Sequence, residues 1–86
     1  MERNEVELRV KKVIAEVLEM DQSKIQPEAN FIFDLGADSM QSLMLVAGLE
    51  EEFNIRMDED KALEIQSVLG AVDYVGSILA EKEHAK

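Results

Sequence analysis

The sequence predicts a single all-α domain: a small four-helix bundle with a long loop between the first two helices and a short third helix. The chain has 86 residues, the size of one small domain. Its residues are 47% hydrophobic but only 5% aromatic, a composition that favours helices packed through aliphatic side chains. Apolar residues also recur at helical spacing. We expect one domain over residues 1–86, with its packed part over about 3–81 and a frayed tail at 82–86.

The first helix is predicted over about residues 3–19, because apolar residues recur there at steps of three and four with charged residues between them. Its core-facing residues are Val6, Val10, Val13, Ile14, Val17 and Leu18. On the solvated side, Lys11 and Lys12 lie four residues from Glu7 and Glu16, respectively, a spacing that predicts weak surface ion pairs.

Turn-forming residues then predict a long connection over residues 20–38. Four apolar side chains are expected to tie this loop to the core: Ile25, Phe31, Ile32 and Leu35. A connection of this length without regular structure is usually functional.

The second helix is predicted to start after Asp38 and to end near Phe53. The carboxylate of Asp38 can cap this helix, because it can accept a hydrogen bond from an amide two or three residues later. Apolar residues at steps of three and four predict its core stripe. These residues are Leu45, Val46, Leu49 and Phe53.

Two more helices are predicted in the last third of the chain. The acidic run at 58–60 suits the positive end of a helix dipole and should start a short helix that ends near Ile65. Ser67 is the expected cap of a last helix from Val68 to about Glu81. Its inward residues are Val68, Ala71, Val72, Val75, Ile78 and Leu79.

Charge and composition exclude several kinds of partner. The formal net charge is −10, so nucleic acid and anionic membrane surfaces would be repelled, whereas basic protein surfaces are complementary. There is no cysteine, hence no disulfide framework or thiolate metal site. The start of the chain lacks the pattern of a secretory signal, and the longest mostly apolar run, residues 43–49, is too short to cross a bilayer. We expect a soluble, cytoplasmic domain without stable membrane insertion.

Residues for catalysis or metal binding are sparse. The only histidine, His84, lies near the end of the chain, where it cannot serve a Ser-His-Asp hydrolase. A calcium loop that began at Asp58 would need Gly and Glu at the sixth and twelfth positions, but residues 63 and 69 are both Leu. We therefore predict no catalytic residue and no metal site, which disfavours an acidic metal-buffering protein.

The turn before the second helix carries the most informative chemistry. It contains Gly36 and delivers Ser39 to the first helical turn, directly after the capping Asp38. One interpretation is that Ser39 only helps to start the helix. The other is that its hydroxyl carries a phosphate group, which would lie beside unpaired amides and the positive end of the helix dipole.

The hexapeptide from Asp34 to Ser39, Asp-Leu-Gly-Ala-Asp-Ser, resembles the attachment sequence of acyl carrier proteins. Further segments are similar to the bacterial, discrete members of that family, in the same order and without an evident gap. These segments are residues 10–14, 29–31, 49–53 and 72–75. The resemblance spans about residues 5–80 and implies the four-helix acyl carrier fold.

The resemblance implies that Ser39 receives the 4′-phosphopantetheine arm of coenzyme A from a phosphopantetheinyl transferase, as a substrate rather than a catalyst. Asp38 corresponds to the acid beside that serine. The arm would supply the thiol that carries acyl groups as thioesters in fatty-acid, lipid or polyketide-like biosynthesis, which agrees with a chain without cysteine. In the family, an acyl chain can enter the core between the helices. The implied partners of a monomeric carrier are acyl-loading, condensing and acyl-transfer enzymes with basic docking surfaces.

The resemblance also identifies the second helix as the surface that partner enzymes recognise. Glu50, Glu51 and Glu52 correspond to acids at the end of that helix in the family, where they would meet Arg and Lys of partners. Three residues near the start of the helix depart from the family pattern. Met40 stands where the family usually has Leu, and Gln41 and Met44 stand where fatty-acid carriers present acids. The expected partner-binding residues are Met40, Gln41, Leu43, Met44, Ala47, Glu50 and Glu51.

These departures leave two interpretations open. Either Met44 lies partly in the core and Gln41 is merely solvated, or the helix is apolar and adaptable because the carrier serves a dedicated set of enzymes. Phe33 is another departure, because many relatives are polar there. Its ring could bind a partner, shield the acyl chain or close the loop over the core.

Two alternative functions also remain open from the sequence. One is a carrier for amino acids or other acids in a dedicated pathway. The other is a helical protein-interaction module that has lost the modification, in which Ser39 is only part of the helix start. Modification of Ser39 by a transferase distinguishes the carriers from the interaction module.

Overall fold

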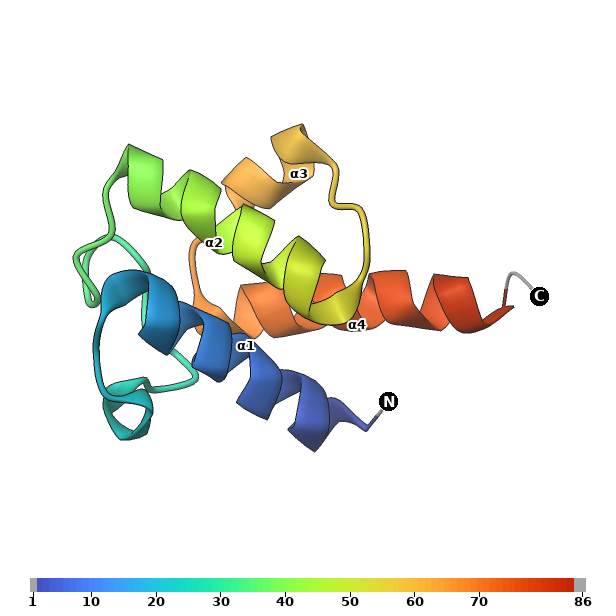
Figure 1. The fold of residues 1–86 in the computed structure, drawn as a ribbon, viewed down its shortest axis with the longest axis horizontal. Helices are drawn as coiled ribbons and strands as arrows, with labels where there is room; N and C mark the ends of the chain where they lie inside the picture. The colour runs from blue at the N-terminus through green and yellow to red at the C-terminus, as the bar shows by residue number, and fades with distance from the viewer. Residues whose placement is uncertain (1, 85–86) are drawn as a thin grey trace.

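Four α-helices and one turn of 3₁₀-helix form the described part of the chain, residues 2–84 of the computed structural model (Figure 1). The side chains of residues 59, 63, 83 and 84 lie outside the description, and with them the imidazole of His84. The predicted all-α, four-helix fold is confirmed. The helices are α1 (Arg3–Leu18), η1 (Gln22–Lys24), α2 (Ser39–Phe53), α3 (Glu59–Glu64) and α4 (Val68–His84).

The helix ends agree with the sequence-based bounds except at two places. Helix α1 ends one residue earlier than predicted, where Glu19 adopts a left-handed backbone conformation with φ of 53°. Helix α4 continues to His84, through part of the segment that we expected to fray. Residues 85–86 of that segment lie outside the described residues.

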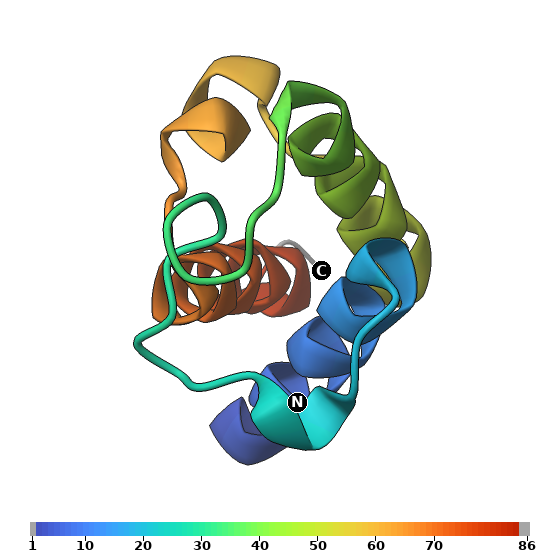
Figure 2. The same cartoon turned by 90° about the vertical axis from the view of Figure 1, so that its left-hand side faces the viewer.

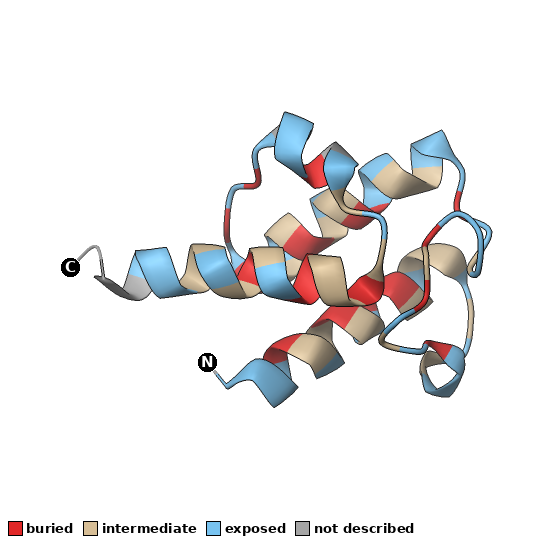
Figure 3. Ribbon diagram, turned by 180° about the vertical axis from the view of Figure 1, so that it is seen from behind, coloured by how far each residue is buried: buried red, intermediate tan, exposed pale blue. Residues whose placement is uncertain are grey.

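Helices α1, α2 and α4 pack around one core, and their buried residues are coloured red in Figure 3. The predicted core positions are confirmed as buried or as partly buried against this core. The buried ones are Val6, Val10, Val13, Ile14, Leu45, Leu49, Phe53, Val68, Ala71, Val72 and Val75. Val17, Leu18, Val46, Ile78 and Leu79 are partly buried.

Helices α1 and α2 approach each other closely at Gly48. A Cβ atom on this residue would lie 2.8 Å from Cγ1 of Val13, which is shorter than van der Waals contact. The absence of a side chain at this position therefore lets the two helices pack at their present separation.

The loop between α1 and α2 is hydrogen-bonded to the segment that precedes α4. The amide of Phe31 donates to the carbonyl of Gln66 at 2.9 Å, and the amide of Val68 donates to the carbonyl of Ala29 at 3.1 Å. Figure 2 views the molecule from this end, where the loop and the start of α2 lie together. The loop is thus joined to α4 as well as to the helices that it connects.

Three of the four apolar residues expected to tie this loop to the core do so. Ile25 and Phe31 are buried, and Leu35 packs partly against the core. The expectation for Ile32 was wrong, because its side chain is 57% exposed. The chain turns sharply here, with the amide of Ile32 donating to the side-chain oxygen of Asn30 at 2.9 Å, and the side chain that faces the core is that of Phe31.

One of the two ion pairs predicted on α1 forms. The Lys11 ammonium lies 3.1 Å from the carboxylate of Glu7, as predicted. The Lys12 ammonium instead lies 3.4 Å from the carboxylate of Glu52 on α2, so its predicted pairing with Glu16 was wrong. The Glu52 carboxylate is only 17% exposed and also pairs with Arg9 of α1.

Candidate functional site

Ser39 is the first residue of α2, and its position is set by a reciprocal cap. The carboxylate of Asp38 accepts a hydrogen bond from the amide of Gln41 at 2.8 Å, while the side-chain oxygen of Gln41 accepts one from the amide of Asp38 at 3.1 Å. This capping box confirms Asp38 as the cap and gives Gln41 a local role that we did not predict. The spacing Asp-x-x-Gln is typical of a capping box and could have predicted this role from the sequence.

The turn that leads to Ser39 is fixed by hydrogen bonds and by one glycine. Gly36 has a positive φ of 74°, a conformation that side chains rarely adopt. The buried Ala37 donates its amide to the carbonyl of Phe31 at 2.7 Å. The carboxylate of Asp34 accepts the amide of Asn30 at 2.7 Å. The start of α2 is therefore anchored to the loop on several sides.

The environment of Ser39 suits a phosphodiester. The residue is exposed, so an enzyme can reach its hydroxyl. Within the described residues, the amides of Asp38 and Gln41 are capped by side chains, whereas those of Ser39 and Met40 have no acceptor in the protein. Free amides and the positive end of the helix dipole stabilise an anion at this point.

A cavity of about 470 Å³ opens beside Ser39, between α2, α3 and the loop. This volume is within the range of small-molecule sites. The polar residues in its lining are Ser39, Ser42 and Gln66. All other lining residues are apolar: Ile14, Phe31, Ile32, Leu43, Leu45, Val46, Leu49, Met57, Ala62, Ile65 and Ala71. The cavity can therefore hold an apolar chain.

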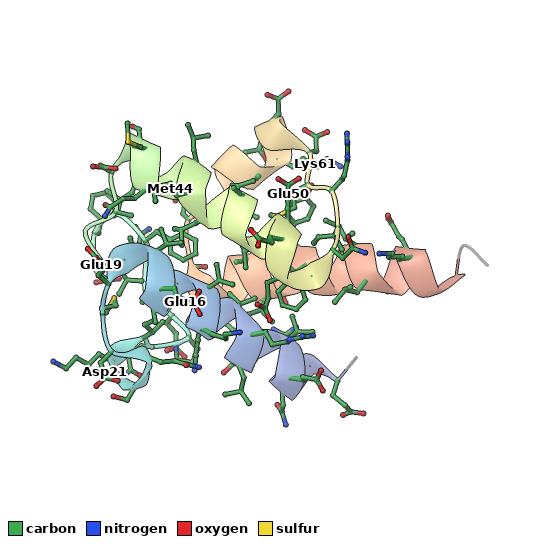
Figure 4. All side chains as sticks on the ribbon, in the orientation of Figure 1. Glu16, Glu19, Asp21, Met44, Glu50 and Lys61 are labelled. Atoms are coloured by element: carbon green, nitrogen blue, oxygen red, sulfur yellow. The ribbon has the colours of Figure 1, made fainter. Side chains whose placement is uncertain are left out.

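Most of the predicted partner-binding residues are exposed on α2. Met40 is 71%, Leu43 49% and Met44 48% exposed, and Ala47 and Glu51 are also exposed. Met44 lies on an early turn of the helix (Figure 4). Met44 is exposed and is not among the residues that pack against the core, so the interpretation that it lies partly in the core was wrong.

Two residues in the predicted partner-binding set are engaged within the protein. The side chain of Gln41 closes the capping box, so the interpretation that it is merely solvated was wrong. The carboxylate of Glu50, on a late turn of α2 in Figure 4, accepts the amide of Met57 at 2.9 Å. Glu52 is likewise paired with α1. Of the three acids at the end of α2, Glu51 is the one that projects into solvent.

The position of Phe33 excludes one of its three interpretations. Its side chain is 87% exposed, so it does not close the loop over the core. Its amide donates to the side-chain oxygen of Asn30 at 2.9 Å, which fixes the backbone from which the ring projects.

The acidic start of α3 has the structural role expected for it. The carboxylate of Asp58 accepts the amides of Asp60 and Lys61, at 3.0 and 3.4 Å, and thereby caps the helix. Among the residues that the structure describes, no three His, Cys, Asp or Glu side chains are grouped as metal ligands. In the same part of the chain, no helix has the length and hydrophobicity required to cross a bilayer.

Together, the fold and this site define a small helical domain that presents a serine hydroxyl at a helix start beside an apolar cavity. Residues 8–75 match the family model described as a phosphopantetheine attachment site. The match covers more than half of the chain, so the chain belongs to this family of carrier proteins. Domains of the family carry covalently attached 4′-phosphopantetheine, which confirms the cofactor predicted from the sequence.

Proposed function

We propose that Ser39 is the residue to which 4′-phosphopantetheine is attached and that the protein is an acyl carrier protein of the bacterial, discrete type. The observation that carries the proposal is an exposed serine at the first position of α2, which lies within the matched residues and lines a largely apolar cavity. When bound, the arm supplies a thiol on which acyl groups are held as thioesters. Ser39 is then modified by another enzyme and catalyses nothing itself.

The residues around Ser39 act by holding it in place. Asp38 and Gln41 cap α2 and keep the serine in the first helical turn. The amides of Ser39 and Met40 are available to a phosphate, and the helix dipole favours its negative charge. Gly36, with its positive φ, lies in the turn before this helix start, and Ser39 is exposed, so a transferase can reach its hydroxyl.

Intact-protein mass spectrometry tests the attachment site. The apoprotein is incubated with coenzyme A and a broad-specificity phosphopantetheinyl transferase, and Ser39→Ala and Ser42→Ala are treated in parallel. We expect one phosphopantetheine on the wild-type chain and on Ser42→Ala, and none on Ser39→Ala. No addition to a wild-type chain that circular dichroism shows to be folded would favour the unmodified interaction module instead.

The cavity supports an acyl cargo, as used in fatty-acid, lipid or polyketide-like biosynthesis. Its lining is mostly apolar, and each methylene that moves from water into such a site contributes about 0.8 kcal/mol. An acyl group on the arm should therefore raise the melting temperature, and more so for a longer chain. Ala62→Leu, which reduces the cavity, should lessen that gain. A melting temperature independent of chain length would argue for a short or polar cargo, such as an amino acid.

The exposed start of α2 supports a carrier that serves a dedicated set of enzymes. Met44→Glu restores an acid on the exposed side of the helix without disturbing the cap. Gln41→Asp also removes the capping glutamine, so the single Met44 variant is the cleaner test. We expect Met44→Glu to raise turnover with general fatty-acid synthase enzymes. Unchanged turnover would remove the support that Met44 gives to specialisation.

A further inference from the structure

Three polar residues lie in the otherwise apolar lining of the cavity beside the start of α2. They are Ser39, Ser42 on the same helix, and Gln66 on the segment between α3 and α4. Ser39 is the proposed attachment residue, so its oxygen would be bonded to the arm. Ser42 and Gln66 have no part in that attachment, and a chain of carbon and hydrogen alone would offer them no hydrogen bond.

The polar lining residues lie on the side of the cavity that is open to solvent. Ser39 and Gln66 are exposed and Ser42 is partly exposed, whereas apolar lining residues such as Ile14 and Leu49 are buried. An acyl chain that enters from an arm on Ser39 leads with its apolar tail, because the amides of the arm remain in water. The first carbons after the thioester therefore lie at the polar side, and the tail lies among the buried residues.

The hydroxyl of Ser42 is oriented so that it can accept a hydrogen bond. Its Oγ donates to the carbonyl of Asp38 at 3.0 Å, at the start of α2. A serine hydroxyl has one hydrogen to donate and lone pairs that accept. Because the hydrogen is engaged by Asp38, Ser42 Oγ can accept a hydrogen bond from a cargo but cannot donate one unless the internal bond breaks.

The side chain of Gln66 can both donate and accept. Its backbone is fixed, because its carbonyl accepts the amide of Phe31 at 2.9 Å and the next residue, Ser67, pairs with Asn30 in a β-bridge. Across the described part of the chain, the side-chain amide of Gln66 makes no hydrogen bond to another protein group. Its NH₂ donor and its carbonyl acceptor are therefore both available to a cargo.

A hydroxyl group on the cargo matches these two side chains. An alcohol near the thioester can donate its hydrogen to Ser42 Oγ while its oxygen accepts from the amide of Gln66. A ketone on the same carbon can only accept, so it can bond to Gln66 alone. A saturated chain bonds to neither and displaces water from both, which costs free energy because polar groups lose their partners.

We propose that Ser42 and Gln66 form a subsite that binds a hydroxyl group on the third carbon of an acyl cargo, so that the cavity holds 3-hydroxyacyl groups as a class. This carbon is two bonds beyond the thioester carbon and stays on the polar side of the cavity. Condensation of two acyl thioesters leaves an oxygen on the same carbon, which makes it a common point of difference among acyl groups. The proposal rests on the proposed function, because an arm on Ser39 must bring the cargo to the cavity.

Thermal denaturation of the loaded protein tests the subsite. A phosphopantetheinyl transferase loads the wild-type chain with octanoyl, 3-oxooctanoyl, 3-hydroxyoctanoyl or 8-hydroxyoctanoyl groups on the arm, each joined through an amide so that the cargo is not hydrolysed. The two hydroxylated cargoes are isomers, so they differ only in where the hydroxyl lies. We expect a higher melting temperature for the 3-hydroxy isomer, because the other would bring its hydroxyl among buried apolar residues. Equal melting temperatures for the two isomers would overturn the proposal.

Matched glutamine variants assign the effect to the cavity. Gln66→Met keeps the length of the side chain but removes its amide, so it should lower the melting temperature of the 3-hydroxyoctanoyl form by about 2–5 °C relative to the octanoyl form. Gln26→Met makes the same change at an exposed loop residue outside the cavity lining and should shift both forms equally. Ser42→Ala should also lower the hydroxylated form more than the octanoyl form. Equal shifts of the two forms in Gln66→Met would overturn the proposal.

Nuclear magnetic resonance gives a second measurement, which a general change in stability would not move. Replacing octanoyl by 3-hydroxyoctanoyl should shift the side-chain amide resonances of Gln66 and leave those of Gln26 in place. Unshifted Gln66 resonances would overturn the subsite. Mass spectrometry of each sample separates this proposal from the proposed function: a chain that accepts no arm overturns both, whereas a loaded chain that does not distinguish the isomers overturns the subsite alone.

Discussion

The two ends of α2 differ in what their side chains contact. At the C-terminal end, Gly48 admits close packing against Val13, and Glu52 pairs with Arg9 of α1 at 3.0 Å. Arg9 also lies over the ring of Phe53, 5.6 Å from its centroid. At the N-terminal end, Met40 leads a row of exposed apolar side chains. One helix thus combines a structural end, which packs against α1, with an end that exposes apolar side chains.

This difference shows that residue type alone does not indicate role within α2. Acidic side chains suit solvent, yet at the structural end two of them, Glu50 and Glu52, bond within the protein. The apolar residues, which suit a core, are exposed at the other end, at Leu43 and Met44. Matched substitutions at the two ends can test whether the division is real.

The largest expected difference lies between two leucines of α2. Leu49 is 3% exposed and Leu43 is 49% exposed. Leu49→Ala should lower the free energy of unfolding by about 2–4 kcal/mol, because it removes buried methyl groups and enlarges a cavity. Leu43→Ala should lower it by less than about 1 kcal/mol. Urea denaturation measures both, and similar losses would contradict the division of the helix into two ends.

A pair of glycines tests the close contact between α1 and α2. Gly48→Ala places Cβ against the stiff, buried Val13 and should destabilise the fold by about 1–2 kcal/mol, even though Ala favours helices. Gly76 lies within α4 with nothing within 4 Å of an added Cβ. Gly76→Ala should therefore stabilise by about 0.5–1 kcal/mol. The opposite signs are read from thermal denaturation, and a neutral Gly48→Ala would mean that the helices separate easily.

Substitutions of the neighbouring acids Glu51 and Glu52 should also differ in their effect on stability. Glu52 is 17% exposed and pairs with both Arg9 and Lys12. Glu52→Gln should destabilise by about 0.5–1 kcal/mol, with a smaller loss at high salt. Glu51→Gln, at an exposed site, should leave stability unchanged. Equal effects in chemical denaturation at low salt would show that the α1 to α2 ion pairs do not contribute.

The sequence predicted the fold well because the core periodicity and the caps are local signals. Asp38 and Ser67 cap the helices that they were expected to cap, and Ser67 Oγ accepts the amide of Gly70 at 3.1 Å. Long-range pairing was not predictable in this way. Lys12 bonds to Glu52, forty residues away, because the approach of α1 to α2 brings them together. Helical spacing alone indicated only its neighbour Glu16.

The proposed attachment residue was also indicated by local sequence, whereas its surroundings were not. Ser39 stands out because of the turn and the cap before it. The cavity is formed by α2, α3 and the loop, so it depends on tertiary packing that no single segment encodes. The exposure of Ile32 and Phe33 likewise depends on how Asn30 turns the loop, and apolar type alone pointed Ile32 inward.

The smallest expected effect is at Asp21, far along the loop from Ser39, and it depends on pH. Hydrogen bonds from the Ser23 amide, and secondarily from its hydroxyl, lower the pKa of Asp21 below its ordinary value. A carboxylate whose pKa is lowered in the folded state contributes stability above its unfolded pKa, near 4, and loses it as pH falls through the folded pKa.

Asp21→Asn should therefore lower the melting temperature slightly at pH 7, and the difference from wild type should disappear in more acidic solution. Ser23→Ala should reduce the same pH-dependent difference, because it removes the hydroxyl donor. Thermal scans between pH 7 and pH 3 measure both. Modification of Ser39 by a transferase should be unaffected at pH 7, since Asp21 and Ser23 lie at the start of the loop and Ser39 follows its end. A change in that modification would mean that the whole loop, rather than the segment fixed by Asn30, positions Ser39.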